Sequence, residues 1–171
     1  GGGTGGFAVP LAELGCRVDV VDPSPDSLAA LERRAAEAGV GQRVRARQGD
    51  ATDVVGLLGA DAVDLVLCHS VLEVVEDPGA ALRDLVTVLR PGGAASILVA
   101  NRVGATVARV AAGRLSEAAE MVRSATGVAG PSDPLRRRYS AEELGDLVTR
   151  AGLRPASTHG VRVFWDSAPE S

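Results

Sequence analysis

Glycines at the start of the chain and an acid after the next predicted strand could together bind a nucleotide. Five of the first six residues are glycine, and a glycine backbone can adopt positive φ and approach a ligand closely. Asp22 follows Gly1 by 21 positions, close to the roughly 20-residue spacing at which a βαβ unit places a carboxylate on a ribose hydroxyl. A purely structural glycine turn with an ordinary strand-end aspartate is the alternative, because one glycine motif is weak evidence.

A second acid and a histidine follow the next two predicted strands. Asp50 comes just after the strand 44–48, and His69 comes just after the apolar run 63–67. The carboxyl ends of parallel strands meet at the ligand-binding edge of an open α/β sheet, so we expect both residues there. Asp50 could instead be a turn acid that caps the helix 54–58. His69 could be a general base, but the favoured interpretation is a neutral imidazole that packs on a ligand or bonds backbone.

The elements that position these groups alternate between helix and strand. Such alternation predicts an α/β fold with a Rossmann-like, doubly wound and mostly parallel sheet. The runs 63–67 and 94–100 are unbroken and apolar, which predicts strands buried on both faces. The predicted helices cover residues 7–14, 25–38, 54–58, 77–89 and 141–151, and the predicted strands cover 17–21, 44–48, 63–67 and 94–100.

Both ends of the chain bear on the sheet. A βαβ unit needs a strand before its glycine turn, and nothing precedes Gly1 in this sequence, so we expect the first, central strand to be missing from a fragment. Near the other end, Ala156–His159 and Val161–Trp165 flank Gly160. Two strands so close in sequence pair as a hairpin, which predicts one antiparallel strand near the C-terminus.

Residues 101–138 interrupt the alternation and carry an unusual charge. They contain seven arginines against three acids, whereas the whole chain has a net charge of −4. We expect one domain over residues 1–171 with an insertion at 101–138 over the active-site rim, where insertions often select substrates. Its Gly-, Pro- and Ser-rich part, 124–134, is predicted to be a mobile loop. Arg102 and the cluster Arg136, Arg137 and Arg138 could bind an anionic substrate, although solvated surface charge is the commoner role of such residues.

Composition excludes several classes of function. Aromatic residues make up 2% of the chain, too few for a base-stacking platform on single-stranded nucleic acid. The chain has 18 arginines and no lysine, which excludes lysine-based chemistry. Cys16 and Cys68 are too few for a disulfide scaffold and lack metal-ligand spacing, so we expect no metal and a reduced, cytoplasmic protein. No signal peptide or membrane-spanning segment is visible, and the oligomeric state stays open.

With these parts in order, the chain resembles class I S-adenosylmethionine (SAM)-dependent methyltransferases. The resemblance rests on the glycine turn, the two strand-end acids, the block from His69 to Pro78, and Leu89-Arg90-Pro91-Gly92-Gly93 before a predicted strand. Three runs, 68–73, 102–121 and 160–164, are similar to a bacterial branch whose characterised members methylate the carboxylate of 5-carboxymethoxyuridine in tRNA. A lysine-rich patch of that branch is absent here, and the arginine cluster 136–138 is the candidate substitute.

The resemblance implies a role for each matched position. Gly1, Gly2 and Gly3 would lie against the methionyl part of SAM, and Asp22 would accept both ribose hydroxyls. Asp50, Ala51 and Thr52 would bind the adenine, and His69 would lie against the cofactor as the candidate catalytic residue. Glu73 would face solvent or cap a helix. The methyl acceptor would be a small molecule or tRNA.

Two other functions remain compatible with parts of the sequence. Gly1, Gly3 and Gly6 satisfy the G-x-G-x-x-G pattern of a dinucleotide-dependent oxidoreductase. A tyrosine–lysine proton relay is impossible without lysine, and the turn at 90–93 has no role in that interpretation. A non-catalytic SAM-binding domain or fragment is the second alternative.

Overall fold

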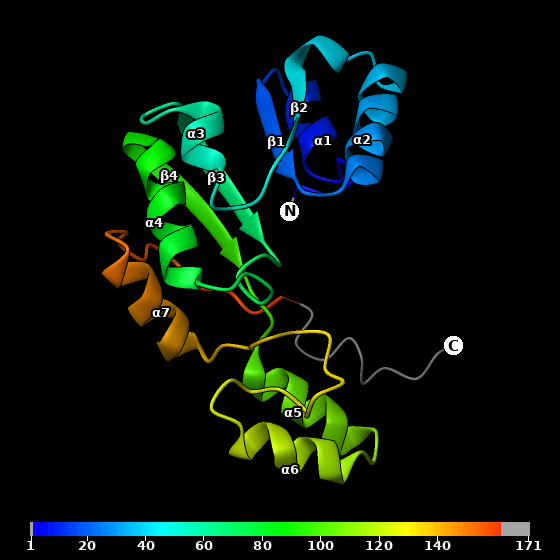
Figure 1. The fold of residues 1–171 in the computed structure, drawn as a ribbon, viewed down its shortest axis with the longest axis vertical. Coiled ribbons are helices and arrows are strands. Elements are labelled where there is room, and N and C mark those ends of the chain that lie inside the picture. Colours follow the sequence, from blue (N-terminus) through cyan, green and yellow to red (C-terminus); the bar gives the residue numbers. More distant parts are fainter. Residues whose placement is uncertain (1, 162–171) are drawn as a thin grey trace. The chain divides into compact units, whose positions relative to one another are not determined.

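The computed structural model describes residues 2–161, and these residues form two compact units. The first unit contains Gly1–Val71 and Arg83–Ile97, and the second contains Leu72–Leu82 and Leu98–Ser171. Figure 1 traces the chain through both units. No helix among the described residues is long and apolar enough to cross a bilayer.

In the first unit, a parallel strand pair is covered by two helices. β1 (Val18–Asp22) pairs with β2 (Val44–Gln48), with Val18 opposite Val44 and Asp22 opposite Gln48. α1 (Ala8–Glu13), α2 (Pro25–Glu37) and the short 3₁₀ helix η1 (Gly41–Arg43) accompany these strands (Figure 1). The core of this region is built by four buried residues, Ala8, Val20, Leu28 and Leu31.

Local sequence signals set the ends of these helices. Ser24 caps α2, because its side chain accepts a hydrogen bond from the Ser27 N–H at 3.2 Å, and Pro25 occupies the first helical position. Gly15 and Gly39 follow α1 and α2 with φ of 98° and 71°. This left-handed conformation is the usual way to end a helix, so the predicted boundaries of both helices are confirmed within two residues.

The first unit also contains β3 (Val63–His69), β4 (Leu89–Leu98) and the short helix α3 (Val54–Leu58). β3 and β4 form a second two-stranded sheet, and their arrows point the same way in Figure 1. α4 (Pro78–Val88) precedes β4. The strand begins at Leu89, so it already includes the predicted turn at 90–93 and starts five residues earlier than expected.

The prediction that 63–67 and 94–100 are buried on both faces is wrong for this structure. Val66 and Cys68 are buried, whereas Leu65 and Leu67 expose 48% and 38% of their surface. Burial also alternates along β4. The physical reason is that a parallel strand is buried on both faces only where elements pack on both, and the face of β3 that carries Leu65 and Leu67 is left without such a layer among the described residues.

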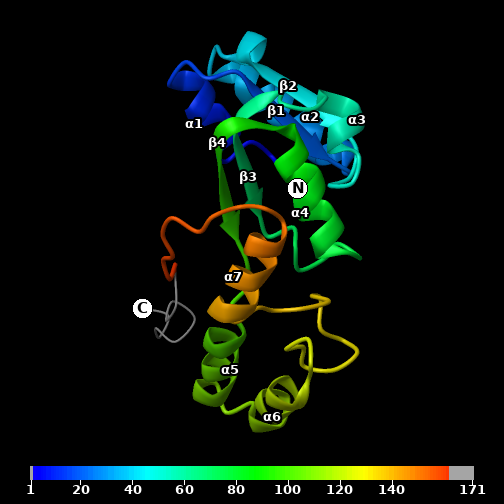
Figure 2. The same cartoon turned by 90° about the vertical axis from the view of Figure 1, so that its left-hand side faces the viewer.

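The second unit is helical. α5 (Arg102–Ala111) and α6 (Leu115–Arg123) pack side by side, as Figure 2 shows, and α7 (Ala141–Arg150) follows a long loop. α7 agrees with the helix predicted over 141–151, and it begins with a capping box in which the Ser140 and Glu143 side chains each accept from the other residue's backbone N–H.

The C-terminal hairpin was predicted over 156–159 and 161–165. Residues 156–159 form no strand, so that part of the prediction is wrong; they are exposed and no neighbouring strand supplies a hydrogen-bonding ladder. Residues 162–165 lie outside the described part of the chain.

Candidate functional site

Two residues of the glycine turn, Gly2 and Gly5, are glycine because the surrounding packing leaves no room for a side chain. The Gly2 N–H donates to the Val21 carbonyl at 3.2 Å, and a Cβ on Gly2 would lie 2.1 Å from a Val20 methyl group. Gly5 has a φ of 91°, and a Cβ there would lie 2.7 Å from Leu31. The structural explanation of these glycines is therefore supported at both positions, because any side chain would force the buried Val20 or Leu31 side chain to shift.

Gly3 differs from its neighbours. Its φ is 57°, and a Cβ built on it would meet nothing within 4 Å. The backbone of this residue is thus left-handed and faces open space, which leaves room for a ligand to approach the main chain.

Asp22 fastens this turn to the end of β1. Its residue is 7% exposed, and its Oδ2 accepts from the Gly3 N–H at 2.9 Å while Oδ1 accepts from the Ser24 N–H at 2.9 Å. A carboxylate has about four lone-pair sites, so this type of group can accept more than two hydrogen bonds, including bonds from hydroxyl donors. The acid and the glycine turn, which the sequence placed 21 positions apart, meet directly.

Asp50 lies at the same edge of the sheet, as predicted from its position after β2. The Gly49 N–H donates to the Asp22 carbonyl at 3.3 Å, which links the two strand ends. The Asp50 Oδ1 accepts from the Ala51 N–H at 2.6 Å, and the Asp50 N–H donates to Asp53 Oδ2 at 2.7 Å. The predicted adenine-binding N–H of Ala51 is therefore already engaged by its own neighbour.

The alternative role of Asp50 as the cap of α3 is not realised. Asp53 occupies the N-cap position of this helix and makes no side-chain capping bond to it. Thr52, the third predicted adenine contact, is exposed next to the buried Ala51.

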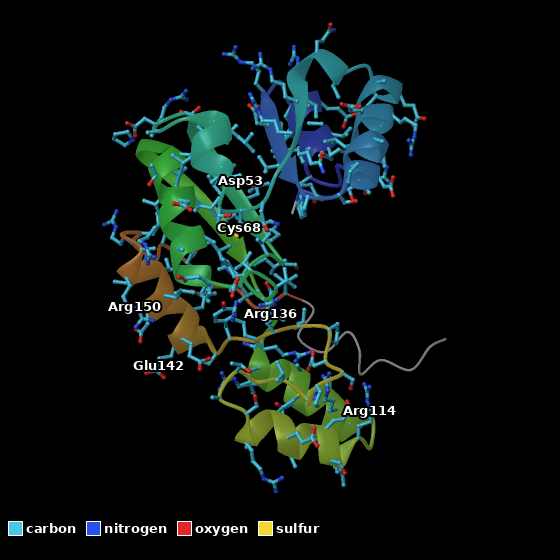
Figure 3. All side chains as sticks on the ribbon, in the orientation of Figure 1. Asp53, Cys68, Arg114, Arg136, Glu142 and Arg150 are labelled. Carbon is cyan, nitrogen blue, oxygen red and sulfur yellow. The ribbon has the colours of Figure 1, made fainter. Side chains whose placement is uncertain are left out.

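His69 ends β3 with one ring nitrogen engaged and the other without a partner. Its Nε2 lies 2.9 Å from the hydroxyl of Ser96 on β4. Its Nδ1 is buried and has no hydrogen-bond partner among the described residues. Unpartnered buried polar atoms are rare, and they often mark a ligand contact or a catalytic role. Cys68, the residue before it, is buried, and Figure 3 labels its side chain.

Phe7 is a site residue that sequence reasoning missed. Its ring contacts the His69 imidazole edge-on, with 4.9 Å between the ring centroids. The available signal was an aromatic residue placed directly after a glycine turn in a chain that has very few aromatics. The contact joins the glycine turn to the end of β3 within the first unit.

In the second unit, three of the four predicted substrate-binding arginines make internal contacts. Arg102 donates to the Ala125 carbonyl at 3.0 Å and to Glu143 at 2.9 Å. Arg137 donates to the carbonyls of the turn 72–76. Both guanidinium groups therefore tie loops together inside the unit.

Arg138 forms a buried ion pair with Asp133. Its guanidinium donates to both carboxylate oxygens, at 2.6 and 3.0 Å, and the two side chains are 6% and 1% exposed. Burial alone would raise the pKa of Asp133, but the bonds from Arg138 and from the Ala129 and Leu135 N–H groups hold that pKa well below its usual range. The loop predicted to be mobile is thus anchored by a charged centre that its Gly-, Pro- and Ser-rich composition did not reveal.

Arg136 is the exposed member of the cluster. Its N–H donates to the Glu73 carbonyl at 3.0 Å, so its backbone is fixed while its side chain reaches solvent. Glu73 was expected to face solvent or cap a helix, and that expectation is wrong, because it is 2% exposed and its Oε1 accepts from the Ala100 N–H at 2.6 Å. It joins the segment after β3 to the segment after β4.

The family model described as a methyltransferase domain matches residues 1–97. The chain belongs to this methyltransferase family. It is 34% identical over 170 residues to the tRNA 5-carboxymethoxyuridine methyltransferase of Escherichia coli strain K12, which covers 97% of the chain and 62% of that relative. It is also 34% identical over 102 residues to the ubiquinone biosynthesis O-methyltransferase of Parvibaculum lavamentivorans, covering 60% of the chain and 39% of the relative. The chain thus spans less than two thirds of the length of these curated relatives.

Solved structures give the same fold. A SAM-dependent methyltransferase of Thermotoga maritima, described as a possible histamine N-methyltransferase, is 26% identical with a TM-score of 0.61 and covers 91% of the chain and 61% of that structure. A SAM-dependent methyltransferase of Methanosarcina mazei reaches a TM-score of 0.69 at 16% identity, covering 88% and 76%, and it supports the fold alone. The predicted α/β, Rossmann-like class is confirmed at this level.

SAM is the cofactor of this family, and the residues in the first unit fit its nucleoside end. Gly3 leaves open space beside its backbone, and Asp22, whose Oδ2 accepts from the Gly3 N–H, is a carboxylate of the kind that accepts bonds from ribose hydroxyls. Among residues 2–161, no group of three or more His, Cys, Asp or Glu side chains could hold a metal ion.

Proposed function

We propose that this protein transfers a methyl group from SAM to an oxygen or nitrogen of an acceptor molecule. The observation that carries the proposal is the bond from the Gly3 N–H to Asp22, which holds a strand-end carboxylate against an open glycine backbone. The family match over residues 1–97 supports the same activity.

Each site residue has one task in this reaction. Asp22 accepts the ribose hydroxyls, and charged acceptors make roughly twice as strong a bond as neutral ones. Asp50, Ala51 and Thr52 contact the adenine, and Gly1, Gly2 and Gly3 line the methionyl end. The sulfonium of SAM supplies an activated methyl group, so the chain contributes chiefly by holding cofactor and acceptor in line.

His69 is proposed to position the reacting groups. Its Nε2 is engaged by Ser96, and its Nδ1 is the atom that remains for a ligand. A carboxylate acceptor carries no proton to remove, so a general base is needed only if the acceptor is a hydroxyl or an amine. The favoured role is therefore contact with the cofactor, with proton transfer as the second candidate.

The acceptor is proposed to be a carboxylate on a tRNA wobble uridine. The support is the name of the Escherichia coli relative, which is 34% identical across almost the whole chain. Arg136 would bind a phosphate or carboxylate of that acceptor, because its side chain is exposed on a fixed backbone. Arg102, Arg137 and Arg138 would support the surrounding loops, given their internal contacts.

Transfer of a tritiated methyl group from SAM is the direct test. Cell extract is fractionated into tRNA, protein and small molecules. Each fraction is incubated with labelled SAM and with the protein expressed from the complete reading frame. Label in the tRNA fraction is expected. Label only in small molecules would support the methyltransferase activity but contradict tRNA as the acceptor. No label in any fraction would favour a non-catalytic SAM-binding domain.

Calorimetric titration separates the alternatives from this proposal. SAM is expected to bind, with Asp22 required for the affinity. Binding of NAD without binding of SAM would instead support the dinucleotide-dependent oxidoreductase. The insertion at 101–138 over the active-site rim and the cytoplasmic location stay predictions from the sequence.

A further inference from the structure

Three arginines follow one another along β2, and we call Arg43, Arg45 and Arg47 the arginine row. Arg45 and Arg47 belong to the strand, and Arg43 ends η1 just before it. Successive side chains of a strand point to opposite faces, so Arg45 and Arg47 share one face and are about 6.6 Å apart along the strand. The whole row is about 13 Å long by the same rise per residue, which is too long for one phosphate group to span.

The row lies on the face of the strand pair that α1 and α2 do not cover. Those two helices pack on the other face, where Val44 and Ala46 of β2 contact the core around Val20. On the row's face, Arg45 is exposed and the side chain of Arg47 is 33% exposed. Both guanidinium groups are therefore accessible from solvent.

Most of the charge in the row has no acid to neutralise it. Asp19 of β1 lies opposite Arg45 in the strand register. Its Oδ1 nevertheless accepts from the Nε of Arg47, at 2.8 Å. Arg43 and Arg45 form no ion pair with any acid in residues 2–161. Three arginines thus share one acid, and two of them keep a guanidinium group for an external anion.

Arg17 adds a fourth cation at the outer end of the row. It directly precedes β1 as Arg43 precedes β2, and the two strands begin in register, so the two arginines start side by side. The Nη1 of Arg43 lies 3.3 Å from the position that a Cβ on Gly15 would take, two residues before Arg17. Arg17 is exposed and also forms no ion pair within the described part of the chain.

The row leads toward the edge of the sheet where SAM is proposed to bind. β2 ends at Gln48, and Asp50, the proposed adenine contact, follows two residues later. Arg47 is therefore the member of the row nearest to that edge, and Arg43 is the farthest. A chain of negative charges lying on the row would have one of its ends at the cofactor edge.

We propose that the arginine row, with Arg17 at its outer end, binds the sugar–phosphate backbone of an RNA strand that runs toward the cofactor edge. This inference rests on the proposed function, because it extends the contacts of the RNA acceptor suggested there. Guanidinium groups match phosphate oxygens in geometry and charge. The scarcity of aromatic residues, 2% of the chain, leaves little base stacking, so these contacts position the RNA without reading its sequence.

The salt dependence of binding to bulk tRNA tests the proposal, measured by fluorescence anisotropy without SAM. Arg43→Gln/Arg45→Gln removes two phosphate contacts and is expected to lower the slope of log affinity against log salt by about 1.4–1.8. Arg33→Gln/Arg83→Gln is the control, because it removes the same charge from exposed positions of α2 and α4. The control is expected to keep the slope of the parent. Equal slopes in the two double variants would overturn the proposal.

Other anions test whether the partner is an RNA strand. The same fall in slope is expected with a single-stranded oligouridylate, and no difference between parent and variant is expected with uridine monophosphate. Equal loss of affinity for the mononucleotide would indicate a site for one small phosphate. The same change of slope with poly-glutamate would indicate a surface for acidic polypeptides. Either result would overturn the assignment to RNA.

A charge-retaining variant guards against loss of structure. Arg43→Lys/Arg45→Lys keeps two point charges that can bind phosphate, so it is expected to keep the slope of the parent. A slope as low as that of the glutamine variant would contradict phosphate binding by these positions. If the glutamine variant self-associated with an unchanged slope, the arginines would protect the edge of β2, and the proposal would be wrong.

The outcome is separable from that of the methyl-transfer assay. Methyl label in tRNA together with unchanged slopes would keep the proposed function and overturn the arginine row as an RNA contact. A lower slope in the glutamine variant without label in tRNA would keep the RNA contact and remove tRNA as the methyl acceptor.

Discussion

Asp22 and the arginine cluster 136–138 were both predicted to bind ligands, but their charged groups are used differently in the structure. Asp22 uses both carboxylate oxygens to accept from backbone N–H groups, and a carboxylate can accept more than one bond at each oxygen. The Arg138 guanidinium donates to the buried Asp133 carboxylate and to a main-chain carbonyl. The Arg137 guanidinium donates to main-chain carbonyls. The comparison teaches that a carboxylate that holds a turn can still be proposed as a ligand acceptor, whereas an arginine whose guanidinium is engaged inside the protein is a poor candidate for binding a substrate.

The largest effect is expected from removing Arg138. Arg138→Leu leaves Asp133 buried without its partner, and breaking such a pair typically costs about 3–5 kcal/mol of unfolding free energy. Chemical denaturation measures the loss. Arg123→Leu, a change at an exposed arginine of α6, is the control and is expected to be nearly neutral. A small change in unfolding free energy in Arg138→Leu would mean that this arginine behaves like an exposed surface charge. The contrast with Asp22 would then be wrong.

The same ion pair predicts a dependence on pH. The folded-state pKa of Asp133 is lowered, so its stabilising contribution is complete above the unfolded-state pKa of about 3.9 and is lost as pH falls below it toward the folded-state value. Unfolding free energy measured from pH 6 downward should therefore fall more steeply in the parent than in Asp133→Leu/Arg138→Leu. Parallel curves would contradict this origin of the acid sensitivity.

Asp22→Ala tests the other side of the comparison. Losing a charged acceptor of hydroxyl groups is expected to weaken SAM binding by more than about 1.5 kcal/mol, or roughly tenfold. Calorimetry measures the affinity, and Asp26→Ala, a change at an exposed acid in the first turn of α2, serves as the control. Unchanged affinity in Asp22→Ala would remove this residue from the cofactor site.

A smaller effect is expected at His69. His69→Ala should weaken SAM binding by about 1 kcal/mol, the worth of one ordinary hydrogen bond, and should change the intrinsic methyl-transfer rate less. Single-turnover kinetics at saturating SAM separates the two quantities. His159→Ala changes the other histidine of the chain and is the control. A large fall in rate with unaltered affinity would assign His69 as a general base.

The smallest effect is expected at Arg136. If its guanidinium contacts one phosphate of an RNA acceptor, Arg136→Ala should lower the slope of log affinity against log salt by about 0.7–0.9. SAM affinity and stability should not change. The control is the same change at another exposed arginine, Arg114→Ala. The Arg114 side chain is 57% exposed, and its Nη1 lies 3.8 Å from Glu117 Oε2. Equal slopes for parent and Arg136→Ala would leave this arginine without a role in binding RNA.

Sequence reasoning succeeded where the signal is local. The caps Ser24 and Ser140 depend on neighbours three positions away, so the helices that they start were predictable. The meeting of Asp22 with the glycine turn was also predictable, because the βαβ unit fixes that spacing.

Contacts between distant segments could not be predicted in this way. The burial of Glu73 depends on the Ala100 N–H, 27 positions later, and no composition or periodicity reports such a pairing. The predictions of a strand over 156–159 and of a buried Leu65 failed for the same reason. Both depend on which other segments pack against the strand, and the local sequence does not report this.

The short bond between the Asp50 carboxylate and the Ala51 N–H has a consequence for ligand choice. An incoming molecule can engage that amide only by displacing a negatively charged competitor that is covalently next to it. Binding there is an exchange of partners rather than the filling of an empty position. Molecules that offer a donor to the displaced carboxylate and an acceptor to the released amide satisfy both groups at once, and those with only one of the two leave a polar group without compensation.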